Sequence, residues 1–107
     1  MYIQMRYEWD PRKNRENQRK HDAISFELAT MVFDDEYRIL VKDRVDESGE
    51  QRWHATGAFW LGPDVGDVFT VVHVYREDEN GEEIIRIISA RRASPDEFRR
   101  YQEQEMD

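Results

Sequence analysis

The sequence predicts an α+β domain in which helices pack on one face of an antiparallel sheet. Two observations support this prediction. Two segments before residue 34 begin at residues that favour helix starts, and four runs rich in β-branched and aromatic residues follow them. Turn residues separate the four runs, and the pair Asn80-Gly81 is a strong hairpin signal. At 107 residues, the whole chain (1–107) is expected to form one domain.

Two helices are expected near the N-terminus. The first covers residues 11–21 with Asp10 as its N-cap, and it has no apolar stripe. It is therefore either a solvated surface element or a helix with a functional polar face, and the residues alone leave both open. Helical spacing places four polar residues on one side: Lys13, Asn17, Lys20 and His21. The second helix, over residues 26–33, has Ser25 as its N-cap and an apolar stripe for the core.

The strands of the sheet are expected at four positions: 37–43, 51–60, 67–76 and 82–92. Residues 1–7 alternate loosely and could add a short N-terminal edge strand. The last run carries isoleucines on both of its faces, which is typical of a central strand. It ends at a capping box, with Ser94 as the N-cap and Glu97 at N3, that predicts a C-terminal helix over residues 95–105.

Charge is unevenly distributed along the chain. The formal net charge of −8 argues against indiscriminate nucleic-acid binding, because phosphate contacts need clustered Lys and Arg. Two segments are nevertheless basic. Residues 11–21 contain five basic residues against one acidic residue, and residues 86–100 contain five arginines against two acidic residues. If the two segments meet in space, the domain has one basic face on an acidic body.

Several kinds of chemistry lack the residues they need. There is no cysteine, no glycine-rich phosphate loop and no Gly-x-Ser-x-Gly motif, and the three histidines have no metal-ligand spacing. No metal or cofactor is therefore expected, and without a long apolar run the protein is expected to be soluble and cytoplasmic, with no membrane partner. The remaining Lys, Arg, His and carboxylates suit cleavage of RNA by its own 2′-hydroxyl, which needs a base, cations and a proton donor. Composition permits this reaction without selecting it.

A pattern of residues extends in order along nearly the whole chain: Tyr7-Glu8-Trp9-Asp10, Lys13, Asn17, Lys20-His21, Ser25-Phe26-Glu27, Ala29, Val32-Phe33, Asp35, Glu50-x-Arg52, Gly57, Arg86-Ile87-Ile88-Ser89-Ala90-Arg91-Arg92-Ala93, Glu97 and Tyr101. This pattern resembles the BrnT family of type II toxins, which are ribonucleases with a RelE-like fold. The chain departs from the family where Gly usually follows the Lys-His pair, since Asp22-Ala23-Ile24 stand there instead.

The resemblance implies a metal-independent endoribonuclease toxin that cleaves RNA and inhibits translation and growth. It also implies a protein partner, a BrnA-type antitoxin with a ribbon-helix-helix DNA-binding domain, in an assembly of two toxins with two antitoxins. The DNA contacts would then belong mainly to the antitoxin. The alternative is a non-catalytic binding module of the same fold that engages an antitoxin or a regulatory partner.

Five residues are candidates for catalysis. Arg91 is the first candidate for a phosphate-binding cation, and Arg52 is the second. Lys20 and His21 could bind substrate and transfer protons, and Glu50 could act as a base or orient Arg52. Four further residues are candidates for RNA binding: Lys13, Asn17, Arg86 and Arg92.

Structural alternatives stand beside these roles. Arg91 could form an ion pair with Glu50 or Glu97. Lys20 and His21 could be a solvated helix end whose positive charge favours the C-terminal dipole.

Overall fold

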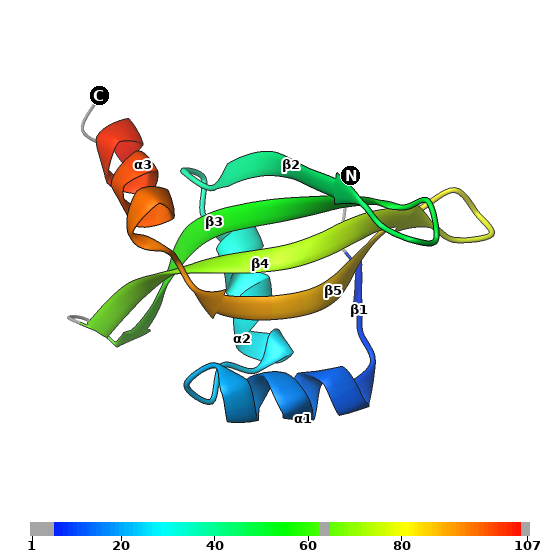
Figure 1. Ribbon diagram of the computed structural model, residues 1–107, viewed down its shortest axis with the longest axis horizontal. Coiled ribbons are helices and arrows are strands. Elements are labelled where there is room, and N and C mark those ends of the chain that lie inside the picture. Colours follow the sequence, from blue (N-terminus) through cyan, green and yellow to red (C-terminus); the bar gives the residue numbers. More distant parts are fainter. Residues whose placement is uncertain (1–5, 63–64, 106–107) are drawn as a thin grey trace.

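Five strands form one twisted sheet in the order β1-β5-β4-β3-β2 (Figure 1). Their bounds are β1 Arg6–Glu8, β2 Ile39–Val45, β3 Gln51–Gly62, β4 Val65–Glu77 and β5 Glu83–Arg92. The computed structural model of the chain describes residues 6–62 and 65–105. Residues 1–5 of the predicted N-terminal strand and residues 63–64 of a predicted turn lie outside the described residues.

The α+β class is confirmed, but the sheet is mixed rather than wholly antiparallel. β2, β3, β4 and β5 pair antiparallel in sequence order, whereas β1 pairs parallel with β5, with Tyr7 opposite Ile85. β5 therefore has a neighbour on each side, as its isoleucines predict for a central strand. A parallel neighbour was not predicted because three residues carry almost no periodic signal.

The helices are α1 Pro11–Lys20, α2 Phe26–Ala29 and α3 Pro95–Glu105, with a 3₁₀ helix, η1, at Thr30–Asp34. All three predicted caps are confirmed. The Asp10 carboxylate accepts from the Arg12 N–H at 2.8 Å, and the Ser25 hydroxyl accepts from the Leu28 N–H at 3.1 Å. At α3, the Ser94 hydroxyl accepts from the Glu97 N–H at 3.2 Å, and the Glu97 carboxylate accepts from the Ser94 N–H at 2.8 Å.

The second predicted helix is shorter than expected. The α-helical turn ends at Ala29, and the chain continues as η1 rather than as an α-helix to residue 33. At this point the Thr30 hydroxyl donates to the Glu27 carbonyl at 2.7 Å, a local bond that can compete with the regular α-helical bonds. The tighter 3₁₀ turn still buries Val32 and Phe33.

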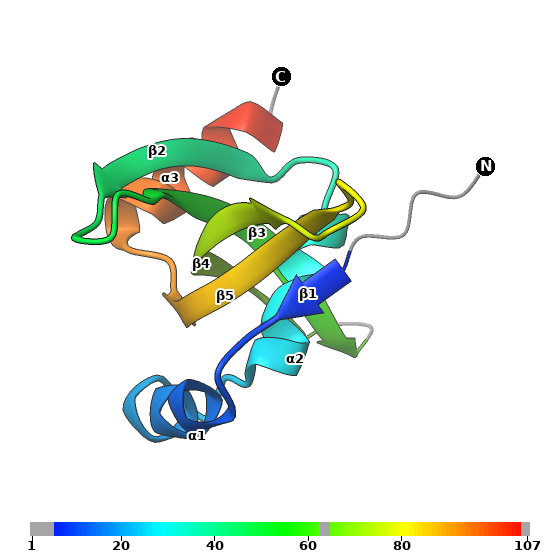
Figure 2. The same cartoon turned by 90° about the vertical axis from the view of Figure 1, so that its right-hand side faces the viewer.

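The core lies between the sheet and the layer formed by α2 and η1. Phe26, Ala29 and Val32 have no exposed surface and pack in one cluster with Val71 and Ile85 of the central strands. α3 lies on the opposite side of the sheet, as two perpendicular views show (Figures 1 and 2). The expectation that all helices share one face is therefore wrong. The sequence does not show the side on which α3 packs, because its few apolar residues give only a weak pattern.

α1 docks onto the protein through amide side chains instead of an apolar stripe. Asn17 is 6% exposed, and its amide group pairs with the edge of β5: Nδ2 donates to the Ala90 carbonyl at 2.8 Å, and Oδ1 accepts from the Ala90 N–H at 3.0 Å. Nδ2 also donates to the Ile24 carbonyl at 3.0 Å, and the Ser89 hydroxyl donates to Oδ1 at 3.3 Å. One turn earlier, the Asn14 side chain accepts from the Phe26 N–H at the start of α2. The inward face of this helix is therefore polar and structural.

Candidate active site

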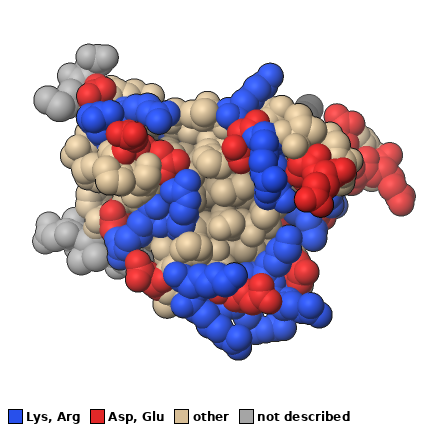
Figure 3. Space-filling model, viewed as in Figure 1, with Lys and Arg blue, Asp and Glu red and all other residues tan. Residues whose placement is uncertain are grey.

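The sheet face opposite α2 carries Arg91 and Arg52, the first two candidates for a phosphate-binding cation. Strand register places Thr56 opposite Thr70, and Thr70 opposite Arg91. Because side chains alternate along a strand, Arg52 and His54 share this face with Thr56. Figure 3 shows this face with an uncharged centre and with Lys, Arg, Asp and Glu gathered around it. α3 covers one end of the face and leaves the rest open (Figure 1).

Arg91 is held at the α3 end of this face by Glu97. Its two terminal nitrogens donate to the two carboxylate oxygens of Glu97 at 2.7 and 3.2 Å, a bidentate pair. The pKa of Glu97 falls from 4.5 to about 2, because the hydrogen bonds from Arg91, Ser94 and Thr70 and the charge of Arg91 outweigh the opposing effect of burial. Glu97 therefore stays ionised and fixes the orientation of the Arg91 guanidinium.

His54 lies on the other side of Glu97. Its Nδ1 is 3.7 Å from a Glu97 oxygen, and its Nε2 is 3.2 Å from a carboxylate oxygen of Asp43 on β2. The His54 side chain is 26% exposed, so it is held in place and still reaches solvent. A hollow of about 220 Å³ opens beside it, with these lining residues: Ile39, Val41, Lys42, Asp43, His54, Thr56, Glu97 and Arg100. The structure thus brings an arginine, a histidine and a concavity together.

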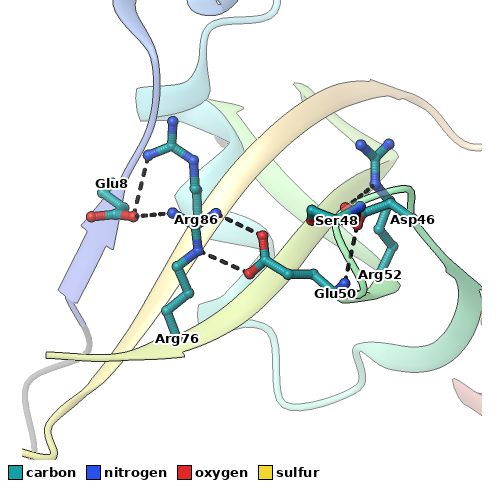
Figure 4. Close-up of polar contacts among 7 residues, drawn as sticks. All are labelled: Glu8, Asp46, Ser48, Glu50, Arg52, Arg76 and Arg86. Atoms are coloured by element: carbon teal, nitrogen blue, oxygen red, sulfur yellow. Dashed lines mark hydrogen bonds and ion pairs between the residues drawn. The ribbon is translucent and has the colours of Figure 1, made fainter.

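A second charged cluster occupies the opposite end of the face (Figure 4). Arg76 donates to both carboxylate oxygens of Glu50, at 3.0 and 2.7 Å, and Arg76 and Arg86 both donate to Glu8, at 3.4 and 3.2 Å. Hydrogen bonding from Arg76 is the main cause that lowers the pKa of Glu50 below its usual value of 4.5. A carboxylate held ionised in this way is a weak proton acceptor, which counts against Glu50 as the base.

Arg52 pairs with Asp46 rather than with Glu50. Its Nε lies 3.4 Å from the Asp46 carboxylate, which also accepts from the hydroxyl and N–H of Ser48 and from the Glu50 N–H (Figure 4). These hydrogen bonds, led by that from the Ser48 hydroxyl, lower the pKa of Asp46 to about 2. Asp46 thereby fixes the β2–β3 turn and holds Arg52 beside it. Among residues 6–62 and 65–105, the terminal nitrogens of Arg52 have no hydrogen-bond partner.

The predicted basic segments meet at the C-terminal end of β5. Asp22, just after α1, accepts from the Arg92 Nε at 2.9 Å, and Arg92 also pairs with Asp67 and lies over the Phe69 ring. Lys13 and Lys20 are exposed on α1 and His21 is half-buried at its C-cap. Arg92 therefore faces away from Arg91, and α1 lies around the edge of β5 from the hollow.

The sequence does not identify several residues of these clusters, among them His54, Arg76 and Arg100. A signal for His54 exists, because it follows Arg52 by two residues and so shares its strand face. Its two carboxylate neighbours come from β2 and α3, and no local pattern brings them together. Asn17, a candidate for RNA binding, instead uses all of its side-chain hydrogen-bonding positions within the protein.

Comparison with known proteins identifies the family. No helix in the described part of the chain is long and apolar enough to cross a membrane. A search of curated proteins finds no match to the sequence. The sequence model of one family, described as "Ribonuclease toxin, BrnT, of type II toxin-antitoxin system", matches residues 9–97, which include α1, every strand from β2 to β5 and the start of α3. The chain belongs to the BrnT family of ribonuclease toxins of type II toxin–antitoxin systems.

Proposed function

We propose that this chain is a metal-independent endoribonuclease that cleaves RNA at the hollow beside α3. The observation that carries the proposal is the convergence of Arg91, His54 and Glu97 on an open sheet face. Arg91 supplies a fixed positive charge, and His54 supplies a group of a residue type that exchanges protons near neutral pH. Membership of a ribonuclease toxin family supports the same reaction.

The reaction transfers the phosphate from one hydroxyl to another within the RNA. A base removes the proton of the 2′-hydroxyl, the 2′-oxygen bonds to phosphorus, and the bond from phosphorus to the 5′-oxygen breaks. The leaving 5′-oxygen takes up a proton, and the products are a 2′,3′-cyclic phosphate and a 5′-hydroxyl. Arg91 stabilises the extra negative charge on the phosphorane, and His54 moves a proton in one of the two transfers.

The neighbouring carboxylates fit supporting roles. Glu97 has a pKa of about 2, so it holds Arg91 in place and does not accept the substrate proton. Glu50 is likewise kept ionised by Arg76. His54 is therefore the residue in the cluster best suited to proton transfer, with Glu97 as a positioning residue for both Arg91 and His54.

RNA can follow a basic path in both directions from the hollow. Arg52 precedes Thr56 by four residues on β3, so it lies roughly 13 Å along the same face. Arg52 would contact phosphates on that side of the scissile bond, and Arg86 would do so on leaving Glu8. Lys13, Lys20 and His21 on α1 continue the path around the edge of β5, and we propose binding rather than catalysis for them. Arg92 would bind RNA at that edge only after its ion pairs with Asp22 and Asp67 break.

The partner is a protein antitoxin, as the family implies. We propose a BrnA-type antitoxin with a ribbon-helix-helix domain, in an assembly of two toxins with two antitoxins. In this assembly the antitoxin makes the DNA contacts and the toxin blocks growth only when it is released. An acidic toxin with a net charge of −8 is compatible with that division of roles, because it avoids general binding to DNA.

The test is cleavage of an end-labelled RNA by the purified protein in EDTA, with analysis of the product ends. Wild type should yield 2′,3′-cyclic phosphates. Arg91→Ala and His54→Asn should each lower the single-turnover rate by about 100-fold or more, because each removes a group that acts in the transition state. Arg99→Ala is a matched control, since Arg99 lies on α3 with a side chain 66% exposed and outside the hollow.

Glu97→Gln separates positioning from structure. Glutamine at N3 keeps the capping box of α3 but cannot form the charged bidentate pair with Arg91. We expect an intact α3 by circular dichroism and a rate about tenfold lower. Cleavage that survives Arg91→Ala and His54→Asn unchanged would place the site elsewhere. No cleavage by folded wild type would instead favour the non-catalytic binding module.

A further inference from the structure

A second and larger concavity lies on the other side of α3 from the hollow. This groove has a volume of about 710 Å³ and lies between α3, η1 and the adjoining ends of β3 and β4. Among the described residues, four of the seven exposed large apolar side chains line it: Met31, Tyr37, Trp60 and Phe98. Trp60 is 63% exposed. Tryptophan is a residue whose burial at an interface contributes strongly to the binding free energy. Such a cluster is typical of a protein interaction site.

The charge of the groove defines what it can bind. Its lining contains four carboxylates and neither Lys nor Arg: Asp34, Asp35, Glu36 and Asp67. Asp35 accepts a hydrogen bond from the Tyr101 hydroxyl, and Asp67 pairs with Arg92. The other two have no ion-pair partner within the described ranges, 6–62 and 65–105. A phosphate backbone would be repelled here, so the groove does not continue the RNA path.

We propose that this groove binds a segment of the antitoxin in which apolar side chains are flanked by Lys or Arg. That an antitoxin exists as the partner rests on the proposed function. The chemistry of the bound segment rests on the lining of the groove. Apolar side chains would cover Trp60 and Phe98, and cations would meet Asp34 and Glu36. A second copy of this chain fits less well, because its basic helix, α1, has no apolar stripe to offer.

The position of the groove links binding to inhibition. Residues 97 and 100 of α3 line the hollow, whereas residues 98, 101 and 102 line the groove, so only the helix separates the two. A helix is about 10 Å across. A partner seated in the groove that continues past α3 therefore reaches the hollow and can cover Arg91 and His54. Inhibition by blocking access follows without any change in the fold.

Calorimetric titration of the chain with its antitoxin tests the proposal. Trp60→Glu should weaken the affinity by about 30-fold or more, because it puts a charge at the most exposed apolar residue of the groove. Val45→Glu is the matched control: Val45 is 58% exposed on β2 and outside the groove, so the affinity should change by less than about threefold.

A second variant tests the charge argument. Asp34→Asn/Glu36→Gln removes two carboxylates without removing apolar surface, and it should weaken binding and reduce its dependence on salt. Wild-type affinity in this variant and in a folded Trp60→Glu protein would overturn the proposal. So would sedimentation of the chain alone as a dimer that Trp60→Glu converts to a monomer, since the occupant would then be a second copy.

RNA cleavage separates this inference from the proposed activity. Trp60→Glu should cleave RNA at the wild-type rate and resist inhibition by the antitoxin. Suppose that neither wild type nor Trp60→Glu cleaves RNA, while the groove variants still bind the antitoxin more weakly than wild type does. The nuclease proposal then fails and the docking site stands. If both proteins cleave RNA and both are inhibited equally, the docking site fails and the nuclease proposal stands.

Discussion

His73 lies on β4 with no exposed surface, edge-on against the rings of Phe33 and Tyr75. Its Nδ1 is 3.2 Å from the Val71 carbonyl, and within the described part of the chain its Nε2 has no hydrogen-bond partner. Burial lowers the pKa of His73 from 6.5 to about 4, because the apolar surroundings disfavour the charged ring. The fold therefore requires a neutral histidine in the core.

This histidine should make stability depend on pH. Between pH 6.5 and 4 the unfolded chain binds more protons than the folded protein, so the free energy of unfolding falls as the pH is lowered through this window. From pH 7 to 5, His73 alone should lower it by about 2 kcal/mol. Urea unfolding at both pH values measures this. His73→Phe, which cannot titrate, should lose about 2 kcal/mol less than wild type; equal losses would show that His73 titrates normally.

The chain after α1 adopts a conformation that glycine favours. Asp22 and Ala23 have φ angles of 52° and 61°. The left-handed region costs an L-residue roughly 1–2 kcal/mol. The conformation is kept because it closes the helix end, with the Ala23 N–H donating to the Gln18 carbonyl at 2.9 Å. The Asp22 side chain pairs with Arg92, which offsets part of its strain. The methyl side chain of Ala23 cannot form such a pair.

Ala23→Gly should therefore stabilise the protein. We expect the free energy of unfolding to rise by about 0.5–1 kcal/mol, after allowing for the extra freedom of glycine in the unfolded chain. Ala93→Gly is the control, since Ala93 has a negative φ and its replacement should destabilise. Both changes can be read from the urea midpoint. A loss of stability in Ala23→Gly would mean that the left-handed turn carries little strain.

At the scale of elements, the contact between α1 and β5 depends on one side chain. Asn17 satisfies the outward N–H and C=O of Ala90, where β5 extends beyond its neighbour β1. Asn17→Ala leaves these buried groups without partners and should lower the free energy of unfolding by about 3 kcal/mol. Gln18→Ala, on the same helix, removes only bonds to Asn14 and should cost less than about 1 kcal/mol. Similar losses in thermal unfolding would contradict this role.

The same contact shows what a sequence can and cannot predict. Caps at Asp10, Ser25 and Ser94 were predictable because a cap bonds within three residues of itself. The role of Asn17 was not, because its partner Ala90 lies 73 residues away. In the candidate site, Arg91 and Glu97 are six residues apart, close enough for the sequence to suggest their pairing. The meeting of His54 with Asp43 and Glu97 depends on the folding of β2, β3 and α3 together.

Over the whole molecule, basic and acidic side chains gather on different parts of the surface. Lys and Arg gather along α1 at the lower edge of the face in Figure 3, while the groove beyond α3 holds four carboxylates and no cation. Asn17 of α1 bonds to Ala90 of β5, and Asp22, just after α1, pairs with Arg92, so the basic segments 11–21 and 86–100 lie side by side. A strongly acidic chain can therefore offer one basic path to RNA and one acidic groove to a protein.

This arrangement predicts that α1 contributes to RNA affinity and not to the chemical step. Lys13→Gln/Lys20→Gln should weaken binding of single-stranded RNA and reduce the slope of log affinity against log salt by about 1.4, since each lost phosphate contact removes about 0.7. The single-turnover cleavage rate at saturating RNA should stay at the wild-type value, because Arg91 and His54 are untouched. Arg44→Gln/Arg99→Gln removes the same charge from β2 and α3, away from the path, and should leave the slope nearly unchanged. A rate that falls at saturation would bring α1 into the reactive site.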